Sequence, residues 1–172
     1  MRFFASWHRE SASRDPSRAF APVSAGVLPG TPIGMDDFSI VEADQAEDHY
    51  AGTDVPGEFR RLTGDLGCAQ VAVTLIRVPP HSDFEQGTGH FHEETEEVYV
   101  VTRGTLTMRL GDEIHEVGEN TAVRVAPRTP RSHRNLGDEP VEMWAISRKS
   151  DSGDATKIDD FWEASPEASQ HR

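Results

Sequence analysis

Cysteine is nearly absent from the sequence: Cys68 is the only one in 172 residues. A disulfide within the chain and a metal cluster built from several thiolates are therefore excluded. Because Cys68 lies in an alternating apolar stretch, we interpret it as a small core residue rather than a nucleophile.

Long apolar runs are also missing. No stretch approaches the ~18 apolar residues that a membrane-spanning helix needs, and the first residues lack the apolar core of a secretory signal. We therefore expect a cytoplasmic protein that does not bind a membrane.

Positive charge is scarce as well. The chain carries 17 Lys and Arg residues against 30 Asp and Glu residues, which gives a net charge of −13 at pH 7. Nucleic acids and anionic membranes bind basic surfaces, so this balance argues against both as main partners.

Composition divides the chain into three parts. Residues 1–35 contain so many Pro and Gly residues that no helical or strand period survives, which predicts a flexible N-terminal arm. Residues 36–150 form the predicted domain. Residues 151–172 form a short C-terminal tail, in which the apolar spacing from 158 to 162 predicts one helical turn.

The middle part has the sequence pattern of a β-protein. Residues 71–78 alternate between apolar and polar side chains and are followed by two prolines, a pattern typical of a strand that ends there. Similar short segments recur about every 8–12 residues, separated by Gly, Asp or Pro, which predicts an all-β sandwich or barrel. The segments are 98–102, 105–110, 114–117, 122–125 and 141–146.

Two histidines and a glutamate carry the chemistry in this pattern. His90 and His92 are two residues apart, so on a strand both imidazoles point to the same face. A tight turn after His92 would bring an adjacent strand back beside them, with a carboxylate near its start. Two neutral imidazoles and one carboxylate form a facial ligand set for a divalent metal ion.

The wider spacing resembles the first sequence motif of the cupin family. His-X-His is followed by four residues, Glu97, six residues and Gly104, and the segment 118–135 stands where a second cupin motif is expected. The resemblance covers about residues 69–148 and implies a double-stranded β-helix, or jelly-roll, barrel. It also implies that His90, His92 and Glu97 hold a divalent Fe, Mn, Ni or Zn ion, and that the protein is a homodimer.

The second motif departs from the family pattern. Counting back from Asn135, the position of the usual fourth ligand, a histidine, falls on Arg131. Arginine stays protonated and has no lone pair, so it cannot bind a metal ion. His133 shares the facing of Arg131 on an extended segment and is either a substitute ligand or an aromatic group packed inside the barrel.

Three further side chains are candidates for substrate binding. An inward-pointing Arg131 could hold a carboxylate or phosphate with its planar fork, and Arg124 lies in the same basic segment. The alternative for these arginines is a solvated face that balances nearby acids. Tyr99 would face inward two residues after Glu97 and either donates a hydrogen bond or fills the barrel.

Two functions are compatible with these residues. The first is a metal-dependent enzyme, an oxygenase or isomerase, that acts on a small anionic molecule. The alternative is a non-catalytic module that binds or senses a small molecule, with or without a metal ion, because this fold supports both roles.

Overall fold

The computed structural model describes residues 38–150 and 153–163, which form ten strands and one short 3-10 helix, η1 (Ala43–Gln45). The predicted arm, residues 1–35, lies outside the described residues. Within the described part, no helix is long and apolar enough to cross a membrane. In chain order the strands are β1 (Glu58–Arg61), β2 (Val71–Val78), β3 (Gly89–His92), β4 (Glu97–Arg103), β5 (Leu106–Leu110), β6 (Glu113–Val117), β7 (Thr121–Val125), β8 (Arg131–Arg134), β9 (Val141–Arg148) and β10 (Ala155–Ile158).

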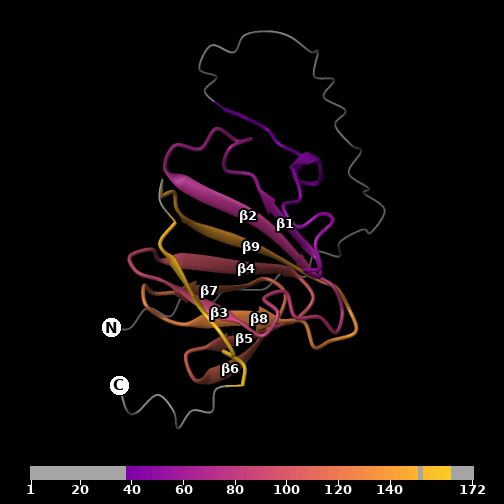
Figure 1. Ribbon diagram of the computed structural model, residues 1–172. Helices are drawn as coiled ribbons and strands as arrows, with labels where there is room; N and C mark the ends of the chain where they lie inside the picture. Colours follow the sequence, from indigo (N-terminus) through magenta and orange to yellow (C-terminus); the bar gives the residue numbers. More distant parts are fainter. Residues whose placement is uncertain (1–37, 151–152, 164–172) are drawn as a thin grey trace, which may run out of the picture. The chain divides into compact units, whose positions relative to one another are not determined.

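The strands form two five-stranded antiparallel sheets (Figure 1). The first sheet has the order β1-β2-β9-β4-β7, and the second has the order β10-β3-β8-β5-β6. From β3 onward successive strands lie in opposite sheets, except that β5 and β6 are neighbours in the second sheet. This arrangement confirms the predicted all-β, double-stranded β-helix fold.

The main hydrophobic core lies between the two sheets. Alternate residues of each strand point inward, as the pleat requires, so β2 places Ile76 and Val78 in the core while Leu75 faces the other side. Leu106 and Met108 of β5 meet them from the second sheet and are fully buried. The period-two pattern of the sequence therefore sets which face of each strand is buried.

A smaller apolar cluster covers the outer face of the first sheet. Leu75 packs there with Leu62 and Ala46, against the half-buried Trp144 of β9. The loop that contributes Ala46 is tied to β1 by Asp48, whose Oδ1 accepts hydrogen bonds from the backbone N–H groups of Tyr50 and Phe59, both at 3.0 Å. This carboxylate fixes the position of β1 at the sheet edge.

The C-terminal segment differs from the expected helical turn. Residues 155–158 form strand β10, which pairs with β3 along its whole length, and a hydrogen-bonded turn follows at 159–163. The apolar residues that suggested a helical period have separate partners: Phe161 is buried, and the indole N–H of Trp162 donates to Ser132 Oγ at 2.7 Å. Pairing with β3 satisfies the backbone groups of a strand that would otherwise end the sheet, which explains the extended conformation.

We predict that Asp48→Ala lowers the free energy of unfolding by about 1–2 kcal/mol at pH 7, because two backbone N–H groups lose their acceptor. Burial acts to raise the pKa of Asp48, but the backbone hydrogen bonds and Arg60 outweigh it, so the pKa lies below its ordinary 3.8. The carboxylate therefore stabilises the fold fully above pH 3.8, and the contribution is lost as the pH falls through the folded-state pKa.

Urea denaturation of both proteins across this pH range measures the difference. Asp65→Ala, in an exposed turn, is the control and should change stability by less than about 0.5 kcal/mol. A deficit for Asp48→Ala that stays constant below pH 3.8 would contradict the assigned role.

Candidate metal centre

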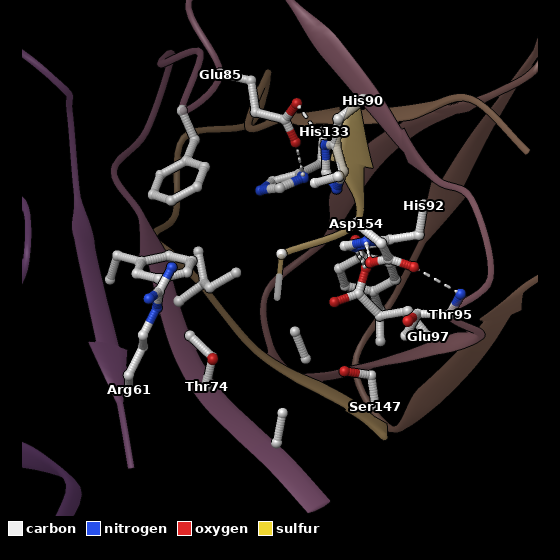
Figure 2. A pocket seen from close by; sticks show the side chains of 18 of the residues that line it. Arg61, Thr74, Glu85, His90, His92, Thr95, Glu97, His133, Ser147 and Asp154 are labelled. Carbon is white, nitrogen blue, oxygen red and sulfur yellow. Dashed lines mark hydrogen bonds and ion pairs between the residues drawn. The ribbon is translucent and has the colours of Figure 1, made fainter. Parts of the chain in front are cut away.

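A cavity of about 810 Å³ lies inside the barrel. Side chains of both sheets line it, among them His90 and His92 of β3, Glu97 and Tyr99 of β4, and His133 of β8 (Figure 2). The cavity therefore contains most of the residues to which the sequence assigns chemistry.

The three predicted metal ligands lie together in this cavity. His90 and His92 are two residues apart on β3, so both face inward. The turn at 93–96 returns the chain to Glu97, the first residue of β4. One potential ligand atom from each residue lies within 4.8 Å of those of the other two. These separations are compatible with a single ion bound by all three.

A carboxylate accepts a hydrogen bond at Nδ1 of each imidazole. Asp154 Oδ1 lies 2.6 Å from Nδ1 of His92, and Glu85 Oε2 lies 3.2 Å from Nδ1 of His90. With the proton held on Nδ1, the lone pair of each neutral ring is on Nε2. Nε2 of His92 faces the site, 3.7 Å from Glu97 Oε2. Carboxylates in this position are typical of metal-binding histidines, because they fix the tautomer and orient the ring.

Arg131 points inward, and its side chain is fully buried. Its guanidinium contacts Glu97, with Nη2 2.6 Å from Oε2, and its Nε lies 3.4 Å from the hydroxyl of Tyr99. Tyr99 in turn donates a short hydrogen bond to the same carboxylate oxygen. The guanidinium group of Arg131 therefore binds Glu97. Arg131 is not among the residues that line the cavity.

These contacts set the charge of Glu97. Burial acts to raise its pKa, but the contacts with His92, Tyr99 and Arg131 outweigh it and lower the pKa to about 2. Burial also raises the pKa of Tyr99 well above its ordinary value of 10, so Tyr99 remains a neutral donor. Glu97 is thus a carboxylate at any physiological pH. No described residue donates a hydrogen bond to its second oxygen, Oε1.

His133 lies apart from the three-residue group. Its ring is 2% exposed and stacks on Phe84, with the ring centroids 5.1 Å apart. Nδ1 lies 3.0 Å from Glu85 Oε1 and is paired with this carboxylate. Within the described part of the chain, Nε2 of His133 has no hydrogen-bond partner.

Arg124 lies outside the cavity. Its side chain is exposed and forms an ion pair with Glu96. Conversely, Glu85 and Asp154 contact the two imidazoles but were not among the predicted site residues. Glu85 precedes His90 by five residues and could have been noticed for that reason. Asp154 had no such signal, because it approaches His92 only through the pairing of β10 with β3.

Residues 74–147 match the family model described as a cupin domain. Residues 74–147 are therefore a cupin domain. The cupin barrel also includes β1 and β10, which extend the two sheets on either side of the matched segment.

Several known proteins are similar to this chain. An uncharacterised protein from Methanocaldococcus jannaschii is 30% identical over 69 residues, which cover 40% of this chain and 55% of that protein's length. A cupin protein from Bacteroides fragilis superposes with a TM-score of 0.55 at 19% identity, over 69% of this chain and 89% of that one. A cupin-superfamily sugar phosphate isomerase from Silicibacter pomeroyi superposes with a TM-score of 0.52 at 19% identity, over 65% and 76% of the two chains. At these identities the structural likenesses show the fold.

We predict that Asp154→Ala lowers the free energy of unfolding by about 2 kcal/mol. Besides His92, the carboxylate accepts hydrogen bonds from the backbone N–H groups of Glu94 and Thr95, at 3.1 and 2.9 Å, so its loss releases the turn between β3 and β4. Chemical denaturation at pH 7 measures the change. Asp159→Ala, which removes an exposed carboxylate paired with Lys157, should cost less than about 0.5 kcal/mol. Equal stability of the two variants would contradict the structural role of Asp154.

Proposed function

We propose that this cupin binds one divalent metal ion through Nε2 of His90, Nε2 of His92 and the carboxylate of Glu97, and that it acts on a small anionic molecule in the cavity. The observation that carries the proposal is the pair of carboxylates at Nδ1 of the two histidines. Any buried imidazole needs a hydrogen-bond partner, but a carboxylate at Nδ1 is typical of metal ligands, which gain both orientation and basicity from it.

The donor set supports this choice of ligand. Two imidazoles and one carboxylate suit Fe, Mn, Ni or Zn ions and leave coordination positions open on the cavity side. The open positions matter because a substrate or water must reach the ion in a catalytic site. When bound, the ion would supply a Lewis acid next to the substrate or a centre for dioxygen chemistry, as an isomerase or an oxygenase requires.

The residues of the chain have distinct parts in this function. Glu85 and Asp154 hold the imidazoles in one tautomer, and Arg131 and Tyr99 hold the Glu97 carboxylate ionised and in place. Such fixed geometry favours catalysis, since little reorganisation is needed when the substrate binds. The homodimer and the cytoplasmic location expected from the sequence remain predictions.

A second candidate function is binding or sensing of a small molecule without a metal ion. The ion pair between Arg131 and Glu97 favours it, because the guanidinium neutralises the carboxylate at 2.6 Å and its positive charge disfavours a second cation nearby. In that case the imidazoles and Tyr99 would serve as hydrogen-bonding groups.

The two candidates differ in metal content. We predict that full-length protein, stripped with a chelator and then titrated calorimetrically with Zn²⁺, Mn²⁺, Ni²⁺ or anaerobic Fe²⁺, binds one equivalent of at least one ion. His92→Ala should weaken that binding by at least about 100-fold, because losing a ligand costs more than losing its supporting carboxylate, which typically costs roughly 10–100-fold. His115→Ala, an exposed histidine on β6, is the matched control and should bind like the wild type.

Two results would contradict the metal proposal. One is that none of the four ions binds to the wild type, as calorimetry and elemental analysis of the purified protein would both report. The other is that His92→Ala and His115→Ala bind the ion equally well, which would place the ion elsewhere. The first result would favour the metal-free candidate.

A further inference from the structure

The cavity extends from the candidate metal centre across the inner face of the first sheet. In the strand register, Glu97 of β4 lies opposite Ser147 of β9, which lies opposite Ala72 of β2. The next row runs from Tyr99 through Ala145 to Thr74. The four residues of the two middle strands have small side chains and line the cavity, so they form a floor that leaves room for a ligand.

Arg61 of β1 stands at the far end of this floor. It is the partner of Thr74 in the register and lines the cavity, and Figure 2 shows it across the cavity from Glu97. Within the described part of the chain it has no ion-pair partner, and its guanidinium lies 5.3 Å from the ring centroid of Phe59. By contrast, Arg60 and Arg77 nearby are paired with carboxylates. In a chain with 30 acidic residues, an unpaired guanidinium above a cavity is available to bind an anion.

An independent feature of the opposite wall also points to a ligand. His133 is almost fully buried and lines the cavity, and its Nδ1 is paired with Glu85, yet its Nε2 has no hydrogen-bond partner among the described residues. A buried polar group without a partner costs about 1–3 kcal/mol. A ligand with a hydroxyl or carbonyl group at this depth would satisfy it.

We propose that the cavity binds an elongated small-molecule anion whose carboxylate or phosphate group is held by Arg61. The middle of the anion lies over the floor of small residues and hydrogen-bonds to His133. The other end of the anion reaches His90, His92 and Glu97. Only the contact at that other end rests on the proposed function.

The spacing of the strands sets the minimum length of the ligand. β1 and β4 are separated by three inter-strand spacings, so their backbones lie about 14 Å apart. A compact anion such as formate or oxalate is too short to contact both ends at once. Carboxylate and phosphate share the chemistry that recognises them, because a guanidinium fork can donate two parallel hydrogen bonds to either.

Straight-chain dicarboxylates from malonate to suberate provide a graded set of probes. Each probe is titrated calorimetrically into the full-length protein in two conditions, with the metal ion that the protein retains and with excess chelator. Binding should be tightest for probes of intermediate chain length. The analogues of that length with one carboxylate replaced by phosphonate then distinguish the two anionic groups. We expect Arg61→Gln to weaken binding of the best probe at least tenfold, about 1.4 kcal/mol, and to remove the length preference.

Two further variants complete the test. Arg103→Gln, which removes an exposed positive charge on β4 outside the cavity, is the matched control and should bind the probe like the wild type. His133→Phe keeps an aromatic ring against Phe84 but removes the polar nitrogens. It should weaken binding of 4-oxopimelate, which carries a central carbonyl group, more than binding of pimelate, which lacks one.

The inference and the proposed function fail in different ways. If Arg61→Gln and Arg103→Gln bind every probe equally while metal content is unchanged, the inference is overturned and the metal site stands. If no metal binds but binding of the probes in excess chelator still requires Arg61, the anion site stands and the metal proposal fails. Absence of binding by the wild type for the whole series also overturns the inference.

Discussion

The ion pair between Arg131 and Glu97 is the contact on which the site depends most. Glu97 belongs to β4 of the first sheet and Arg131 to β8 of the second, so the pair joins the two walls of the barrel from inside. Buried charges are tolerated only when each has a partner, and removing one partner of such a pair typically costs about 3–5 kcal/mol. The pair keeps Glu97 ionised and fixes the position from which it faces His92.

Two further carboxylates determine which nitrogen of each imidazole faces the site. Glu85 and Asp154 approach the histidines from behind, on the side away from Glu97, and leave Nε2 as the nitrogen available to a ligand. Asp154 comes from the segment just before β10, which pairs with β3 and therefore forms part of the barrel. The geometry of the site thus depends on a segment at the C-terminal end of the fold as well as on the motif residues.

The sequence predicted local features well and contacts between distant segments poorly. The two-residue period placed His90 and His92 on one face, and the alternation in 71–78 identified β2, because both are properties of a single strand. The partner of Arg131 was not predictable from spacing, since the two residues meet across the barrel. Arg61 was missed because β1 has only four residues, too few for alternation to indicate which side faces inward.

The central claim is that His90, His92 and Glu97 hold a metal ion while Arg131 stays paired with Glu97. A crystal structure of protein grown with the ion it binds best, with data collected at that ion's absorption edge, tests this directly. The account predicts one anomalous peak about 2.0–2.2 Å from Nε2 of both histidines and from a Glu97 oxygen, the distances typical of zinc and similar ions. No peak at this position in excess metal, with the imidazoles oriented as they are here, would contradict it.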